Sequence, residues 1–66
     1  MHPTSLTTPA AASHLGLAAS TLEKLRVNGG GPLYIKMGRA VRYRLSDLDQ
    51  WLDERVVRNT SEKLFQ

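Results

Sequence analysis

The sequence contains no cysteine, only one tryptophan, two tyrosines and one phenylalanine, and no long apolar run. Without cysteine, disulfide bonds and a thiolate zinc site are excluded, and the absence fits a reducing cytosol. No apolar stretch approaches the roughly 20 residues that a membrane-spanning helix needs. Residues 1–5 lack the basic and apolar regions of a signal peptide. We therefore expect a cytoplasmic protein that makes no use of a membrane.

Residues that could carry catalysis or hold a metal are also scarce. His2 and His14 have no arrangement of Ser and Asp beside them that identifies a catalytic triad, and His14 is expected to be a partly exposed helical residue. The carboxylates of the C-terminal third have no His or Cys at ligand spacing. The run Gly29-Gly30-Gly31 lacks the following Lys and Ser or Thr of a phosphate-binding loop, so it is interpreted as a connector. We expect no enzyme, no catalytic residue, no metal and no cofactor.

The charged residues are distributed unevenly along a chain whose net charge is only +3 and whose pI is about 9.8. Sixty-six residues allow one domain with a modest core. Between residues 24 and 44 every charged side chain is basic: Lys24, Arg26, Lys36, Arg39, Arg42 and Arg44. The next segment holds most of the acids, namely Asp47, Asp49, Asp53 and Glu54. Such a two-sided molecule is typical of proteins that bind phosphate groups.

Capping residues, helix stops and apolar spacing together predict three helices. The first runs from about Pro9 to Leu15, with Thr7 or Thr8 as its cap and Gly16 as its stop. The second covers about 19–27, with Leu22 and Leu25 facing inward, and 28–32 connects it to the next element. The third begins at Ser46, where 46–49 resembles a capping box. Its apolar stripe, with Trp51 in the core, consists of Leu48, Trp51, Leu52 and, as a further candidate, Val56.

Residues 33–45 predict a β-hairpin in one of two registers. A two-residue Gly38-Arg39 turn has the better turn chemistry, because glycine suits its first position. We expect the three-residue loop 38–40 instead, since it separates apolar from basic side chains and a buried face usually dictates register. The inner face would then hold Leu33, Ile35, Met37, Val41, Tyr43 and Leu45. The outer face would hold Tyr34, Lys36, Arg42 and Arg44.

In that register Lys36 lies directly opposite Arg42, beside Arg44. Like charges opposed across strands are destabilising, which suggests an anionic partner that relieves the repulsion. Arg39 at the tip is placed to enter a minor groove or to hold a nucleic-acid backbone. The competing explanation is that the charges only protect the strand edges from aggregation.

The second helix presents outward the hydrogen-bonding side chains of Ser20, Thr21 and Lys24. Hydroxyl groups can reach base edges or phosphates, and Lys24 can reach a phosphate or a guanine. An ordinary solvated helix face has a similar composition. The hairpin therefore carries more of the DNA-binding interpretation than this helix does.

An ordered series of short motifs is similar to a known family. The series is Leu-Thr-Thr-Pro, Leu-Gly-Leu, Ser-Thr-Leu, Gly-Pro, Tyr-Ile-Lys-Met-Gly, Val-Arg-Tyr-Arg, Ser-Asp-Leu and Trp-Leu, within residues 6–55. It resembles the small excisionase-type, AlpA-like helix-turn-helix domains of the MerR-like winged-helix superfamily. The resemblance implies an α+β winged helix-turn-helix, with the second helix in the DNA major groove and the hairpin as the wing.

The resemblance also assigns residues. By position, Ser20, Thr21, Glu23 and Lys24 fall on the recognition surface, and Arg39 and Arg42 fall on the wing. The family often has Glu at Ala10 and Ser-Pro at Ala18-Ala19, so both helix starts are expected to be poorly capped here. The bare N–H groups of the second helix could instead meet a phosphate. The long dimerisation helix and effector site of MerR-type activators are not matched, so no metal or drug sensing carries over.

Together these observations predict a sequence-specific binder of double-stranded DNA. Its expected DNA-binding residues are Ser20, Thr21, Glu23, Lys24, Arg26, Lys36, Arg39, Arg42 and Arg44. Such proteins act as excisionases, which bend attachment-site DNA for an integrase, or as small transcription regulators of mobile elements. We expect nucleoid association, a recombinase or RNA polymerase as protein partner, and cooperative self-association on DNA.

The alternative is a protein-interaction module that uses the acidic third helix or the Leu64-Phe65 tail to bind an integrase or polymerase subunit. The expected organisation is a disordered segment 1–5, a winged helix-turn-helix at 6–55 and a frayed tail at 56–66.

Overall fold

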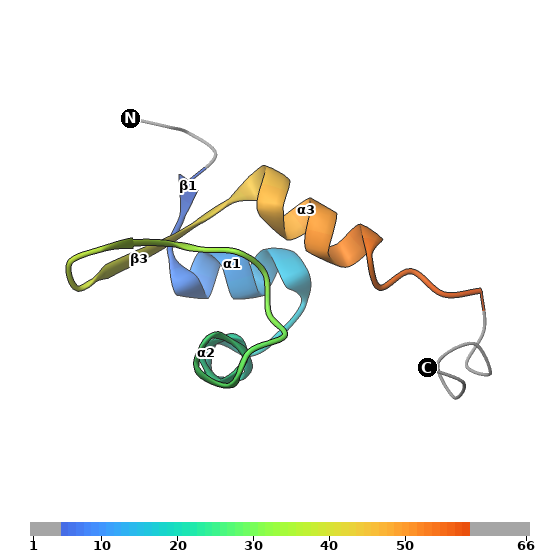
Figure 1. The fold of residues 1–66 in the computed structure, drawn as a ribbon, viewed down its shortest axis with the longest axis horizontal. Coiled ribbons are helices and arrows are strands. Elements are labelled where there is room, and N and C mark those ends of the chain that lie inside the picture. Colours follow the sequence, from blue (N-terminus) through green and yellow to red (C-terminus); the bar gives the residue numbers. More distant parts are fainter. Residues whose placement is uncertain (1–4, 59–66) are drawn as a thin grey trace.

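The polypeptide folds into a helix-turn-helix, a projecting hairpin and a third helix (Figure 1). A short N-terminal strand pairs with the hairpin. The computed structural model describes residues 5–58. The elements are β1 (Ser5–Leu6), α1 (Thr8–Leu15), α2 (Ala19–Asn28), β2 (Ile35–Met37), β3 (Ala40–Arg44) and α3 (Leu45–Asp53). The predicted α+β class and order of helices and hairpin are confirmed.

Helix α1 has a defined start and a defined end. The Thr7 side chain accepts a hydrogen bond from the Ala10 amide at 3.4 Å, as predicted for the cap. Gly16 ends the helix in the left-handed region, at a φ of +74°, and its N–H bonds to carbonyls of the last turn. The expectation that Ala10 leaves this helix start poorly capped is wrong, because Thr7 caps it without the help of a glutamate.

Helix α2 begins without a side-chain cap. Ala18 occupies the cap position with an extended backbone, and no side chain bonds to the first turn, as predicted. Leu22 is completely buried and Leu25 is half-buried, so the helix faces the core as its apolar spacing indicated. The start of α2 therefore relies on packing rather than on a side-chain cap, whereas Gly29 caps its C-terminal end.

The sheet has three strands in the order β1-β3-β2, all antiparallel. The first strand was not expected: Ser5 pairs with Arg44 and Leu6 with Tyr43. Ser5, assigned to a disordered segment by the sequence, is thus part of the sheet. The tail from 59 onward, including Leu64-Phe65, lies outside the described residues.

The hairpin register differs from the expected one. Lys36 pairs with Val41, Met37 with Ala40 and Ile35 with Arg42, so the turn is the two-residue Gly38-Arg39. Gly38 has a φ of +60°, and among residues 5–58 only glycines have a positive φ. Glycine at the first central position is what a type II′ turn requires. Local turn chemistry therefore determines the register here.

Burial does not oppose this register because the hairpin projects beyond the helices (Figure 1). Leu33 and Met37, expected on a buried face, are 68% and 55% exposed. Lys36 and Arg42 do not face each other, so the predicted like-charge pair is wrong. The free hairpin therefore contains no Lys36–Arg42 repulsion for an anion to relieve.

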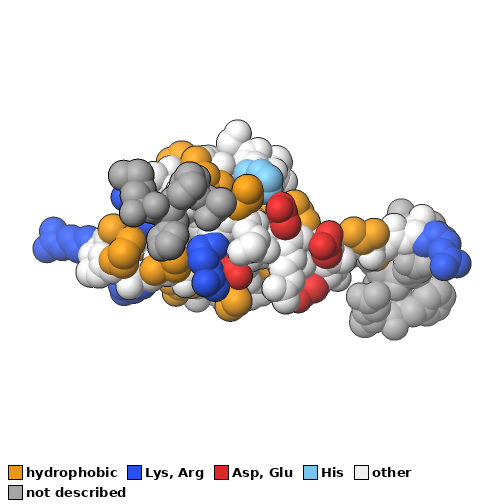
Figure 2. All heavy atoms as spheres, turned by 90° about the horizontal axis from the view of Figure 1, so that it is seen from above, with side chains coloured by type: hydrophobic (Ala, Val, Ile, Leu, Met, Phe, Trp, Pro, Cys, Tyr) orange, Lys and Arg blue, Asp and Glu red, His pale blue; other side chains and the backbone are white. Residues whose placement is uncertain are grey.

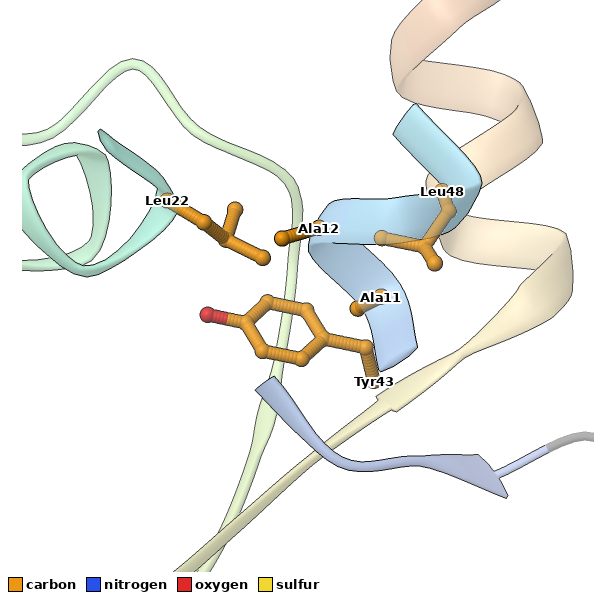
Figure 3. Close-up of a cluster of buried hydrophobic side chains, with 5 residues drawn as sticks. All are labelled: Ala11, Ala12, Leu22, Tyr43 and Leu48. Carbon is orange, nitrogen blue, oxygen red and sulfur yellow. The ribbon is translucent and has the colours of Figure 1, made fainter. Parts of the chain in front are cut away.

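The core is small and draws one or two side chains from each of the three helices and from β3 (Figure 3). Its buried members are Ala11, Ala12, Leu22, Tyr43 and Leu48. The ring of Tyr43 extends from β3 along the face of α1 that carries the two alanines, with its hydroxyl group directed toward α2 (Figure 3). Tyr43 and Leu48 were both predicted as core residues, and this is confirmed. Small alanine side chains let α1 approach both the ring and the leucines.

Helix α3 starts one residue earlier than expected, at Leu45, with Arg44 as its cap residue. The predicted capping box at 46–49 is wrong, since no side chain caps this helix. Arg44 Nε instead donates to Asp47 Oδ2 at 2.7 Å across the first turn. The chain passes from β3 directly into α3 at Arg44, without a connecting loop. Ser46 is therefore already inside the helix and cannot be its cap residue.

Trp51 is half-buried rather than a core residue. Its Nε1 donates to the carbonyl oxygen of Gly30 at 2.8 Å, and Arg55 donates to the same oxygen at 2.9 Å. The Arg55 guanidinium also lies 4.1 Å from the centre of the Trp51 ring. The glycine connector between α2 and the hairpin is thereby held against α3.

Candidate nucleic-acid interface

The outer face of α2 is an exposed surface that carries mostly polar residues and one apolar residue, Val27. Because Leu22 faces the core, the side chains on the opposite side are all exposed: Ser20, Thr21, Glu23, Lys24, Val27 and Asn28. Ser20, Lys24 and Val27 share one stripe at helical spacing, along a shallow depression of the surface. The four residues predicted for this helix face lie together here.

Val27 belongs to the same face and was not predicted. Its side chain is 80% exposed, although the residue is apolar. The signal was present in the sequence, because Val27 comes two residues after Leu25 and so points away from the inner stripe. An apolar side chain on a helix surface can contact the methyl group of thymine.

An open hollow of about 610 Å³ lies between the C-terminal half of α2 and the hairpin. Its lining residues are Arg26, Val27, Tyr34, Lys36, Gly38, Arg39 and Val41. The observed register explains the position of Lys36, which shares a strand face with Val41 and so points toward α2. Three basic side chains thus border a concave surface that continues from the exposed face of α2.

Arg42 and Arg44 lie on the other face of the hairpin. Side chains alternate along β3, so both point away from the face of Tyr43 and from the hollow. Arg42 is half-buried and its Nη1 donates to the Val41 carbonyl at 2.9 Å. Arg44 is paired with Asp47. The expected grouping of Lys36 with these two arginines on one face is wrong.

Arg26 is the most constrained cation of the predicted set. Its Nη1 donates to the hydroxyl group of Tyr43 at 3.1 Å and to Thr8 Oγ1 at 3.3 Å. The guanidinium also lies 5.9 Å from the centre of the Tyr34 ring, which packs on Tyr43 at 6.1 Å between ring centres. The two hydrogen bonds could not be predicted from sequence spacing, since they join residues 17 and 18 positions apart.

The acidic residues cover a different part of the surface. Asp49, Asp53 and Glu54 are exposed along α3, and Asp49 Oδ1 lies 2.8 Å from His14 Nε2 on α1. Figure 2 shows red acidic side chains gathered over the middle of the molecule and a blue basic side chain at the far end of the hairpin. The tip of the hairpin thus lies apart from the acids of α3, whereas the basic and acidic segments meet at the start of α3, where Arg44 pairs with Asp47.

The sequence pattern of the helix-turn-helix domain matches residues 5–56. The chain belongs to the helix-turn-helix domain family. Its α1–turn–α2 unit with a hairpin and a third helix is a small winged helix-turn-helix of the α+β class. A domain of this family indicates double-stranded DNA as the partner.

No curated protein matches this helix-turn-helix chain closely enough to count as a relative. Among residues 5–58, no helix is both long enough and apolar enough to cross a membrane.

Proposed function

We propose that this helix-turn-helix protein binds double-stranded DNA in a sequence-specific way and without catalysing a reaction. The observation that carries the proposal is the continuity between the exposed polar face of α2 and the basic hollow beside it. A helix of this size fits the major groove, and a neighbouring basic concavity fits the sugar–phosphate backbone at the edge of that groove.

In this arrangement α2 reads bases. Ser20, Thr21 and Lys24 offer hydroxyl and ammonium groups to base edges, with Glu23 as an acceptor for the amino group of cytosine. Val27 adds an apolar contact for a thymine methyl group. Because α2 has no side-chain cap, the N–H groups of its first turn are also suited to a phosphate.

The hairpin grips the backbone. Lys36 borders the hollow and Arg39 occupies the exposed turn, from which it can reach a phosphate or the adjacent minor groove. Simultaneous contacts by α2 and by a projecting hairpin favour bent DNA, since bending brings more duplex against the protein. With roughly three phosphate contacts, from Lys24, Lys36 and Arg39, log K should fall with log salt at a slope of roughly −3.

At a finer level, we infer an excisionase-type, AlpA-like protein of the MerR-like superfamily. The support is the ordered motif series within residues 6–55, together with a hairpin suited to DNA bending. Its role would be to direct recombination with an integrase, to regulate transcription of a mobile element, or both. It would then lie with the nucleoid and bind adjacent sites cooperatively.

Selection of duplexes from a random library, followed by footprinting and a curvature measurement on the selected DNA, tests the function. We expect one protected site and a bent duplex. Recovery of no preferred sequence would refute sequence-specific binding. The genes beside the coding sequence separate the two roles, because an adjacent integrase gene implies control of excision.

A second candidate function is protein binding through α3. It is favoured by the exposed acids of α3 and by an open hollow of about 230 Å³ that includes exposed Leu33 and half-buried Trp51. Reversing the charge of Asp53 should weaken binding to an integrase while leaving DNA binding intact. If the chain binds the integrase but does not bind DNA at low salt, protein binding would be its main function.

A further inference from the structure

Arg26 connects the helix-turn-helix to the hairpin. From its place on α2 it donates to Thr8 of α1 and to Tyr43 of β3, and it covers the ring of Tyr34 just before β2. Both hydrogen bonds come from the same nitrogen, so one guanidinium edge holds two elements at a fixed angle to α2. Planar guanidinium groups suit such bridging better than ammonium groups do.

We propose that Arg26 is a positioning residue for DNA binding, which sets the hairpin relative to α2 and does not itself hold a phosphate. The inference rests on the proposed function. It replaces the simpler expectation that every cation between residues 24 and 44 contacts DNA.

The buried partner gives the proposal its strength. Tyr43 has no exposed surface, so its hydroxyl group can meet only protein atoms. A buried phenol normally has a hydrogen-bond partner, and Arg26 supplies it. Charge-assisted hydrogen bonds of this kind are stronger than neutral ones.

The consequence for DNA concerns geometry. The hairpin projects from the body of the molecule (Figure 1). The hollow between the hairpin and α2 has Arg26 among its lining residues. If the hairpin tilts, α2 and Arg39 can no longer meet the same duplex at the same time. A specific site needs both contacts, whereas loose electrostatic binding does not.

The test uses Tyr43→Phe and Arg26→Met in the full chain, with anisotropy measured on a selected duplex and a scrambled one from 50 to 200 mM salt. Tyr43→Phe is the decisive variant, because it removes a hydroxyl group that DNA cannot touch. We expect both variants to lose affinity for the selected duplex, on the order of tenfold for Arg26→Met and less for Tyr43→Phe. Affinity for the scrambled duplex and the salt slope should stay close to those of the wild type.

A matched control is Arg39→Met, which removes a cation from the exposed turn. This variant should bind both duplexes more weakly than the wild type, and the magnitude of its salt slope should be smaller by about 0.9, the value for one phosphate contact. Circular dichroism melting ensures that each protein is folded at the assay temperature.

Three results would overturn the positioning role. A salt slope reduced by about 0.9 in Arg26→Met would make Arg26 a phosphate ligand. Parallel losses on both duplexes at an unchanged slope would mean that the network only stabilises the fold. Wild-type affinity of Tyr43→Phe for the selected duplex would show that the hydrogen bond sets no geometry. If the wild-type chain binds neither duplex, the proposed function itself fails.

Discussion

Arg39 and Arg44 are two arginines of one hairpin with different surroundings. Arg39 lies exposed in the turn, and Arg44 is paired with Asp47 at 2.7 Å at the base of α3. A paired arginine has less to gain from a phosphate, since it must first leave its carboxylate. Position and pairing therefore rank the basic residues more finely than their sequence spacing does.

Replacing Arg39 by Ala should weaken binding to every duplex and flatten the salt dependence by about 0.9 in slope. Replacing Arg44 by Ala serves as the matched variant and should change affinity much less. Equilibrium titrations at several salt concentrations measure both effects. An equal loss in the two variants would mean that pairing with Asp47 does not withdraw Arg44 from DNA.

Lys24 and Thr21 should govern which sequence is bound. Lys24→Ala and Thr21→Ala are expected to change the order of preference among duplexes, at about 1–3 kcal/mol for a lost base contact. Gln50→Ala, an exposed polar change on α3, is the control. Uniform losses on all sequences would make α2 a backbone clamp instead of a reader.

At the scale of elements, the hairpin shows where sequence patterns mislead. The alternation of apolar and basic residues from 33 to 45 favoured a buried face, but a face can dictate register only where something covers it. In the part of the hairpin that projects beyond the helices, the glycine turn determined the register of the strands. Helix α1 followed its predicted cap and stop residues, and α2 followed its apolar spacing because Leu22 does enter the core.

Gly38 offers a direct test of the turn. An L-alanine there would have to adopt a φ of +60°, and its Cβ would contact nothing within 4 Å. Any destabilisation would therefore come from the backbone conformation and not from a steric clash. Gly38→Ala should therefore lower the free energy of unfolding by about 1 kcal/mol. A chemically synthesised chain with D-alanine, which tolerates this φ, should be as stable as the wild type. Urea unfolding of both measures the difference, and equal destabilisation would argue against this turn.

The start of α2 provides a test in the opposite direction. Ala18 already has the extended backbone of a cap residue, at a φ of −70° and a ψ of 147°. Ala18→Ser should raise the free energy of unfolding by about 1 kcal/mol, because its hydroxyl group can accept from the first-turn amides. Thermal unfolding followed by circular dichroism measures the gain. Ala10→Ser, inside α1, is the comparison and should give none.

For the whole molecule, charge and order of elements were predictable and the contacts that assemble them were not. The basic stretch from 24 to 44 and the acids that follow it are visible in the sequence. In the fold the end of the hairpin lies away from the acidic side chains (Figure 2), but Arg44 pairs with Asp47. The strand at Ser5–Leu6 and the two Arg26 hydrogen bonds could not be predicted from the sequence, because their partners lie 17 or more residues away. Trp51 was misassigned because its spacing reveals a helix face but not the Gly30 carbonyl beside it.

The core is small enough that one truncation should matter. Leu48→Ala removes the only fully buried side chain of α3 in the described part of the chain and should cost about 2–4 kcal/mol. A 66-residue domain has little stability beyond this. Thermal unfolding should show a large loss, while Leu33→Ala, at an exposed site, should have a minor effect.

The central claim is that α2 and the hairpin form one DNA-binding surface. Nuclear magnetic resonance titration of the labelled chain with a selected duplex tests it most directly. The account predicts amide shift changes over 20–28 and 36–41, with the exposed acids of α3 at 49–54 little affected. Changes centred on α3, or confined to α2 with the hairpin unperturbed, would contradict it.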